Sequence, residues 1–222
     1  SVQAAINSIK DNSQAIVYLV KDANETVTIP EDKDIVLNTD TFTLSSNEVT
    51  ITNYGTLTIL NSKVSSNGTS INVDNNYAIN NLGNLQVISS NVEANNGGSS
   101  YLASGIKGEG NGSIYIENST VYGSTNGIES TTSNIEIGKK GDLDDTTVIT
   151  GGVYAVDTKD DTKQFTFNSG MLVGIPDPGY KGEAVPPTGY YVYTSIIDGK
   201  YVSVVKLEPT VTLKATKMNT TT

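Results

Sequence analysis

Apolar and polar residues alternate over short segments along most of the chain, and the alternating segments return at a regular interval. The clearest phrase, Ile51–Val64, returns as Ile79–Val92 and, in a looser form, once more in the following repeat. Leu85 lies 85 − 57 = 28 residues after Leu57, and Ile114 lies 114 − 85 = 29 residues after Leu85. A period of about 20 to 50 residues indicates a repeat architecture, and period-2 alternation indicates short strands. The pattern therefore predicts an all-β fold in which the repeats form a β-solenoid.

Stacking of the repeats predicts columns of equivalent side chains. One repeat cannot bury its apolar residues alone, so strands of successive repeats pair in parallel and bury them in a continuous core. Polar residues that recur at one position are expected to form hydrogen-bonded ladders at the corners. We expect two apolar columns (Val64, Val92 and Val121; Leu57, Leu85 and Ile114) and two polar ladders (Ser62, Ser90 and Ser119; Asn53 and Asn81).

Glycine steps such as Gly83-Asn84 and Gly110-Asn111-Gly112 punctuate the repeats. Glycine adopts positive φ without a steric penalty. We therefore expect these glycines to supply the positive φ that a corner needs.

The two ends of the chain differ from its middle. Residues 1–14 contain apolar residues at helical spacing, which predicts a short helix that caps the open end of the stack. The parallel β-helix is expected over residues 15–174. Residues 175–207 begin with a proline-rich stretch and contain the hairpin signal Asp198-Gly199, so we expect a C-terminal strand cap or final irregular coils. Residues 208–222 are expected to be a linker or the start of an immunoglobulin-like domain.

Composition and charge narrow the classes of function. The chain has 222 residues and a formal net charge of −10, so its surface repels phosphate backbones and nucleic acid is not expected as a partner. No stretch approaches 18 consecutive apolar residues, so we expect no membrane insertion by this segment. We expect a monomer. The chain lacks Cys, His and Arg, which removes thiolate chemistry, the commonest general base near neutral pH and the bidentate anion clamp.

Three consecutive phrases carry a family resemblance. The segments Val27–Leu37, Thr39–Leu44 and Asn53–Ser62, in this order, resemble bacterial cell-surface proteins with right-handed parallel β-helix (pectin-lyase-like) repeats. The resemblance covers residues 15–207 and is specific for fold but weak for function. It implies an extracellular, adhesin-like protein, on the surface of or secreted from a Gram-positive, often gut-dwelling bacterium. The chain opens at Ser1-Val2 without a signal sequence, which fits either a cytosolic protein or an exported protein whose signal peptide has been removed. We expect the second, because the other end of the chain also looks cut.

The enzymes of the same fold use residues that this chain lacks. Pectate lyases characteristically use an Arg, polygalacturonases pair Asp with His and Arg, and pectin methylesterases pair Asp with Arg. No catalytic residue of these families can be carried over to this chain, which favours a non-catalytic function.

Acidic residues cluster in two predicted turns, about one repeat apart. If the turns converge, their carboxylates would bind Ca²⁺ through oxygen ligands, although the spacing matches neither an EF-hand loop nor a glycine-rich calcium repeat. The simpler alternative is a solvated acidic corner. No other cofactor is expected. The candidate calcium ligands are Asp142, Asp144, Asp145, Asp160 and Asp161, with Asp157 beside them.

A pair of carboxylates could also hydrolyse glycosides, with one acid protonated and the other ionised. The candidates are Glu136, Asp144, Asp145 and Asp160, and nothing in the sequence places two of them across a cleft.

Tyrosine is the dominant aromatic residue, with 12 Tyr against three Phe and no Trp. Its ring stacks on sugar faces and its hydroxyl bonds sugar hydroxyls. Tyr115, Tyr122 and Tyr154 are the candidate ligand-binding residues, and the polar positions of Tyr115 and Tyr122 predict that they point outward in an exposed row. The alternative is that these rings only cover the edges of the stack.

Three functions remain open from the sequence. The first is adhesin-like binding of host or environmental glycans or surface proteins by a non-catalytic module. The second is a carbohydrate-active enzyme that uses carboxylates only, and the third is a passive structural stalk. A flat face of Asn, Thr and Tyr would favour the first, and a long groove with paired carboxylates would favour the second.

Overall fold

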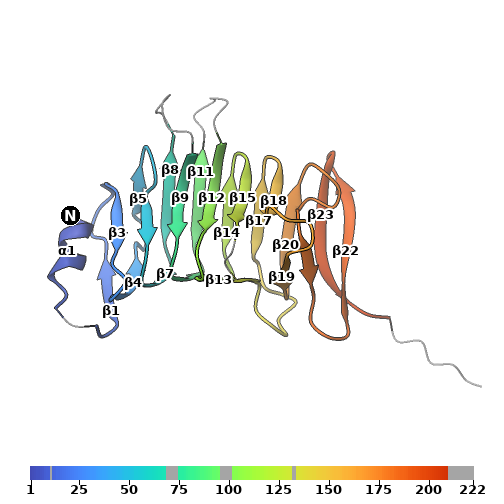
Figure 1. The fold of residues 1–222 in the computed structure, drawn as a ribbon, viewed down its shortest axis with the longest axis horizontal. Coiled ribbons are helices and arrows are strands. Elements are labelled where there is room, and N and C mark those ends of the chain that lie inside the picture. The colour runs from blue at the N-terminus through green and yellow to red at the C-terminus, as the bar shows by residue number, and fades with distance from the viewer. Residues whose placement is uncertain (11, 69–74, 96–101, 132–133, 210–222) are drawn as a thin grey trace, which may run out of the picture.

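The protein is an elongated stack of strands with a short helix at one end (Figure 1). The computed structural model describes residues 1–10, 12–68, 75–95, 102–131 and 134–209. Nearly all of its regular structure is β, and the strands form parallel sheets. The predicted all-β class, with parallel sheets and an N-terminal helix, is therefore confirmed. In the described part of the chain, no helix is both long and apolar enough to cross a membrane.

Consecutive strands belong in turn to three sheets, A, B and C, so from β1 to β17 each strand pairs in parallel with the strand three places later. Sheet A contains β1 (Ala15–Tyr18), β4 (Asp34–Asn38), β7 (Thr56–Leu60), β10 (Asn84–Ile88), β13 (Ser113–Glu117), β16 (Asn134–Ile137), β19 (Gln164–Phe167) and β21 (Glu183–Val185). Sheet B contains β2 (Ala23–Asn24), β5 (Thr43–Ser46), β8 (Lys63–Asn67), β11 (Asn91–Asn95), β14 (Thr120–Gly123), β17 (Val148–Gly151), β20 (Met171–Gly174), β23 (Lys200–Leu207) and β22 (Tyr190–Ile197). Sheet C contains β3 (Val27–Ile29), β6 (Ile51–Asn53), β9 (Asn75–Asn81), β12 (Leu102–Gly108), β15 (Asn126–Ser130) and β18 (Tyr154–Asp157).

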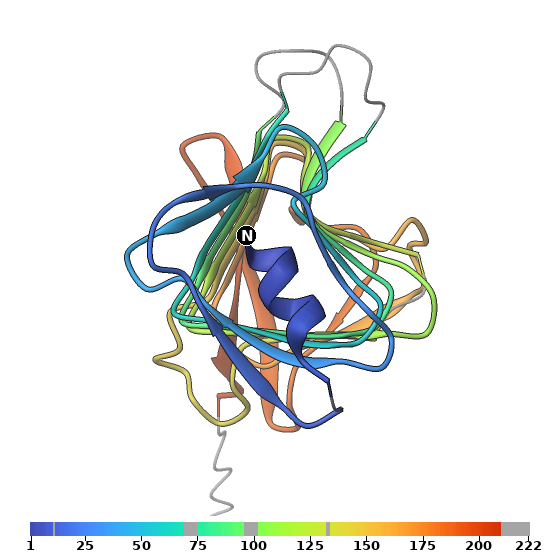
Figure 2. The same cartoon turned by 90° about the vertical axis from the view of Figure 1, so that its left-hand side faces the viewer.

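The helix α1 (Val2–Ser8) covers the N-terminal end of the core, as the end-on view shows (Figure 2). Its Ile6 is buried in the core cluster. Two acceptors satisfy its free backbone donors, because Ser1 Oγ accepts from Ala4 N at 3.1 Å and Glu25 Oε1 accepts from Val2 N at 2.7 Å. The helix thus closes the first repeat, where strand pairing cannot continue.

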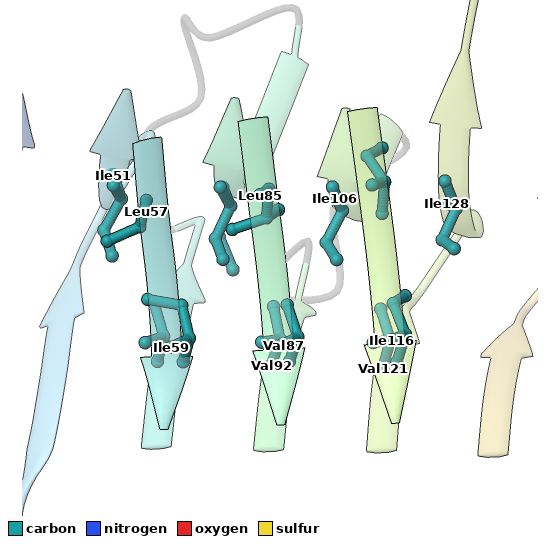
Figure 3. Packing of buried hydrophobic residues seen from close by; sticks show 14 of the residues in the cluster. Ile51, Leu57, Ile59, Leu85, Val87, Val92, Ile106, Ile116, Val121 and Ile128 are labelled. Carbon is teal, nitrogen blue, oxygen red and sulfur yellow. The ribbon is translucent and has the colours of Figure 1, made fainter. Parts of the chain in front are cut away.

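The core is a set of apolar columns that run along the stack (Figure 3). Leu85 pairs in register with Leu57 on one side and Ile114 on the other. The second predicted column has the same arrangement, with Val92 between Val64 and Val121. All six side chains are buried. Both predicted apolar columns are therefore confirmed.

Two polar ladders hold the corners of the stack. Ser62 N donates to Ser90 Oγ and Ser90 N donates to Ser119 Oγ, both at 3.0 Å. The three hydroxyls in turn donate to backbone carbonyls, so each links its own repeat to the one before it. At another corner, Asn53 Nδ2 donates to Asn81 Oδ1 at 2.7 Å. Both predicted ladders are confirmed.

Gly83 and Gly112, at the corner between sheets C and A, serve a purpose other than the one predicted. Gly110 does have positive φ (+66°), but Gly83 and Gly112 do not. A Cβ on Gly83 would lie 2.1 Å from the carbonyl oxygen of Gly55, and one on Gly112 would lie 1.9 Å from that of Gly83. The prediction of positive φ is thus wrong at these two positions, where glycine is needed because successive backbones approach closely.

The C-terminal region both continues the stack and ends it. The short β21 adds a last parallel strand to sheet A. The hairpin of β22 and β23 then adds two antiparallel strands to sheet B, with the predicted turn at Asp198 and Gly199. Residues 210–222, which make up most of the predicted linker or following domain, lie outside the described residues.

Candidate functional site

The three candidate tyrosines lie on three different faces of the protein. Tyr115 belongs to sheet A, Tyr122 to sheet B and Tyr154 to sheet C. All three are half-buried. The predicted single row of tyrosines is therefore not formed, because each repeat contributes one strand to each sheet and the chain turns a corner between Tyr115 and Tyr122.

Tyr115 lies in a shallow depression of about 390 Å³ on the outer face of sheet A. The side chain points away from the core because its neighbours Ile114 and Ile116 are buried in it. Tyr115 pairs in register with Glu136, and Glu136 pairs with Thr166. An aromatic ring, a carboxylate and a hydroxyl thus stand side by side on neighbouring strands. The other polar side chains of the lining are Ser113, Asn134 and Gln164, and Val185 adds an apolar contact.

The phenol of Tyr115 is held as a hydrogen-bond donor. Its hydroxyl donates to Glu117 Oε2 at 2.8 Å, and Lys139 Nζ lies 3.4 Å from Glu117 Oε1. Burial raises the pKa of Tyr115, and the hydrogen bond to Glu117 and the charges of nearby carboxylates, Glu136 among them, raise it further. The hydroxyl therefore stays protonated near neutral pH, and the ring is fixed in the depression.

Glu136 is exposed, yet its carboxylate has a fixed neighbour. Asn168 Nδ2 donates to Glu136 Oε1 at 2.8 Å. Towards the end of the sheet, Gln164 Nε2 donates to Glu183 Oε2 at 2.9 Å. On the other side of Tyr115, the register partner is the uncharged Gln86. The face thus combines a ring, a carboxylate, amides and hydroxyls, a set that can bind hydroxyl groups of a ligand.

The first acidic cluster forms a turn between β16 and β17. Asp145 is buried, and its carboxylate accepts the backbone N–H groups of Asn118, Lys139 and Thr147 at 3.2, 2.7 and 2.7 Å. Asp142 Oδ1 accepts from Asp144 N at 3.1 Å. These carboxylates cap the backbone of the corner between sheets A and B.

The second acidic cluster lies at a different corner. Asp160 and Asp161 are exposed in the turn between β18 and β19, which joins sheet C to sheet A. Asp160 Oδ1 accepts from the backbone and the hydroxyl of Thr162. The two turns therefore do not converge as predicted, and the described residues contain no group of three or more acidic side chains that could hold a metal ion. Of the candidate hydrolytic carboxylates, Glu136 lies on β16 of sheet A, Asp144 and Asp145 lie in the turn that follows it, and Asp160 lies at the corner between sheets C and A.

Sequence reasoning named Asp157 as part of an acidic turn but missed the charged cluster that it forms with Glu129 and Lys159 on sheet C. Glu129 and Asp157 are register neighbours and only 8% and 6% exposed. Lys159 Nζ lies 2.7 Å from Asp157 Oδ2 and 3.4 Å from Glu129 Oε1. The signal in the sequence was the position after the last apolar residue of each strand, which is Glu129 after Ile128 and Asp157 after Val156.

Comparison with known proteins adds no family to this description. The chain matches no protein-family model, no curated protein and no solved structure.

Proposed function

We propose that this chain is a non-catalytic binding module with the fold of a right-handed parallel β-helix. The regular succession of strands from sheet A to B to C supports the β-helix, with the three sheets as its faces. The right-handed winding of the proposed helix follows the general rule that crossover connections between parallel strands are right-handed. The stacked core and ladders make such a module a rigid support for a binding face.

The binding face is the depression on sheet A, and its ligand is a glycan. The observation that carries this proposal is the register pair of Tyr115 and Glu136 inside the depression. A tyrosine ring offers an apolar surface to a sugar, while the adjoining carboxylate and amides accept and donate hydrogen bonds to sugar hydroxyls. Because Glu117 and Glu136 both lie near the ring, the face repels acidic sugars and favours neutral ones.

The setting of this binding is the surface of a bacterium or its surroundings. The support is the resemblance of Val27–Leu37 and Asn53–Ser62 to β-helix repeats of bacterial cell-surface proteins. In that setting the module would act as an adhesin-like element that holds the cell to host or environmental glycans.

The two alternatives have less support. An enzyme that uses carboxylates only needs two of them across a bound sugar, but Asp145 is engaged by backbone N–H groups and Glu136 accepts a hydrogen bond from Asn168. A passive stalk would need no aromatic side chain in a depression of its surface. The sheet A face therefore favours binding.

A glycan array probed with the whole chain tests the proposal. We expect binding to a defined set of neutral glycans by the unaltered chain and by Tyr122→Ala, whose ring lies on sheet B. Tyr115→Ala should lose the same signals. A blank array, or equal signals from Tyr115→Ala, would refute glycan binding at this face.

A further inference from the structure

The last strand of sheet B, β22, presents a long free edge at the C-terminal end of the stack. It has eight residues, whereas the other five outermost strands of the three sheets have two to four. Within the described part of the chain, β23 is the one strand that pairs with it. An edge strand offers a row of unpaired backbone N–H and C=O groups with which another strand can pair.

Other ends of the sheets show the protection that proteins normally give to an edge. At the N-terminal end of sheet C, Gln3 of helix α1 accepts from Thr28 N at 2.6 Å and donates to Thr28 O at 3.1 Å. At the C-terminal end of the same sheet, a loop covers β18, and Lys181 N donates to Val156 O at 2.7 Å. On sheet A, the three-residue β21 is followed by two prolines. By contrast, β22 is long and contains neither a proline nor a charged residue.

The hydrogen bonds of the hairpin identify which backbone groups of β22 are free. Glu208 N donates to Gly189 O at 2.9 Å, and this pair continues the register of the hairpin. Hydrogen-bonded and non-hydrogen-bonded pairs alternate along an antiparallel ladder, so the odd-numbered residues of β22 bond to β23. The N–H and C=O groups of Val192, Thr194 and Ile196 therefore point to the free side.

The hairpin is also a neutral part of an acidic protein. The chain has a formal net charge of −10, but residues 190–208 contain two lysines (Lys200 and Lys206) and two acids (Asp198 and Glu208), so their net charge is 2 − 2 = 0. The Lys206 ammonium lies 3.6 Å from the centre of the Tyr193 ring. Two copies of the chain therefore repel each other less when hairpin meets hairpin than when their acidic surfaces meet.

Large side chains along β22 are exposed to solvent. The exposed fractions are 38% for Tyr191, 42% for Tyr193, 64% for Ile196 and 53% for Ile197. Covering these side chains in two copies would remove on the order of 1,000 Å² from water, which lies at the lower end of the range for specific interfaces. Such a contact forms a dimer that dissociates on dilution.

We propose that β22 pairs with β22 of a second copy, antiparallel about a two-fold axis, so that sheet B continues from one copy into the other. With the axis at Thr194, Val192 lies opposite Ile196 of the second copy, and the free N–H groups of these three residues all find acceptors. On the outer face, Tyr191 lies opposite Ile197 of the second copy, an aromatic and β-branched pair of the kind that stabilises sheets. Because β22 is the last strand of the stack (Figure 1), the two stacks continue end to end. The dimer carries two sheet A depressions and would bind a surface with repeated glycans more tightly than one copy, a consequence that rests on the proposed function.

Sedimentation velocity of the whole chain, from about 1 to 300 µM, distinguishes this dimer from the monomer predicted from the sequence. We expect the dimer fraction to rise with concentration for the unaltered chain and for Ile196→Ala, which keeps the backbone donor. Ile196→Pro removes that N–H from the free side and leaves the hydrogen bonds of the hairpin in place. It should raise the Kd of the dimer at least about tenfold relative to Ile196→Ala. Equal dimerisation of these two variants would overturn the proposal. A monomeric unaltered chain at every concentration would also overturn it, and would leave the edge to an extended segment of another protein.

A cysteine placed on the two-fold axis tests the pairing without a change that threatens the hairpin. The chain has no cysteine of its own. Residues that form a hydrogen-bonded pair in antiparallel strands have Cα atoms about 5.5 Å apart, which suits a disulfide. Under oxidising conditions Thr194→Cys should form a covalent dimer, whereas Thr120→Cys, exposed on β14 of the same sheet, should not. No covalent dimer of Thr194→Cys, or equal amounts from both variants, would contradict pairing through β22.

Discussion

The side-chain amide of Asn53 donates a 2.7 Å hydrogen bond to the Oδ1 atom of Asn81, one repeat further along the chain. Both residues are completely buried. Asn81 in turn donates to the carbonyl oxygens of Gly83 and Ser113. The ladder therefore ties three successive repeats together at the corner between sheets C and A.

Asn81→Ala should lower the free energy of unfolding by about 1–3 kcal/mol, because it leaves buried hydrogen-bonding groups without partners. Chemical denaturation measures the change. Asn91→Ala removes an exposed asparagine from the neighbouring sheet B and should change stability by less than about 0.5 kcal/mol. Equal effects of the two variants would show that the ladder contributes no stability.

Gly83→Ala should destabilise the fold because the new Cβ would lie 2.1 Å from the carbonyl oxygen of Gly55. Forcing the two backbones apart is expected to cost at least about 1–3 kcal/mol, as for other overpacked sites. Gly110→Asn is the matched control, since Gly110 needs only its positive φ and asparagine tolerates that conformation. Thermal unfolding compares them, and a Tm for Gly83→Ala at or above that of Gly110→Asn would contradict the close-approach explanation.

Because the pKa of the Tyr115 phenol is raised in the folded protein, the free energy of unfolding should fall at alkaline pH. Its folded-state pKa lies above the ordinary value of 10.0, through burial first and then through the hydrogen bond to Glu117 and nearby carboxylates. A raised pKa contributes stability that is fully present below pH 10 and is lost as pH rises above it, because the unfolded chain ionises first. The pKa values of Tyr77 and Tyr180 are also raised. Replacing Tyr115 alone therefore removes only part of the dependence of stability on alkaline pH.

Thermal unfolding between about pH 8 and 11, on either side of the ordinary tyrosine pKa, measures this dependence. The unaltered chain and Tyr122→Phe should lose Tm steeply at the alkaline end, and Tyr115→Phe should lose less. The same loss in all three proteins would show that Tyr115 does not couple to folding.

The repeat itself was predictable to the level of individual register pairs. The pairs Leu57–Leu85 and Val64–Val92 follow from one phrase written twice at the same spacing, so burial of one copy dictates burial of the other. The serine and asparagine ladders were predictable for the same reason. Parallel pairing of such similar phrases leaves few alternative registers, because a shift of one strand by one residue would turn its apolar side chains outward.

The candidate site was less predictable because it depends on which corner each loop occupies. The turns of Asp145 and Asp160 were expected to lie about one repeat apart and to converge, but the strands between them pass through sheets B and C before the chain returns to sheet A. The prediction of one row of tyrosines was wrong for the same reason, because the three residues lie on three different sheets. The pairing of Tyr115 with Glu136 crosses a shorter repeat, 136 − 115 = 21 residues, which the 28-residue phrase did not reveal. Aligning Ile114-Tyr-Ile116 with Ile135-Glu-Ile137 would have found it.

We propose that the sheet A depression around Tyr115 and Glu136 binds a neutral glycan. Isothermal titration calorimetry with the strongest glycan from the array measures this binding in the unaltered chain, Tyr115→Ala and Tyr122→Ala. We predict that Tyr115→Ala weakens binding by at least about tenfold, which corresponds to about 1.4 kcal/mol, while Tyr122→Ala leaves the Kd unchanged. An unchanged Kd for Tyr115→Ala in a correctly folded protein would contradict the claim.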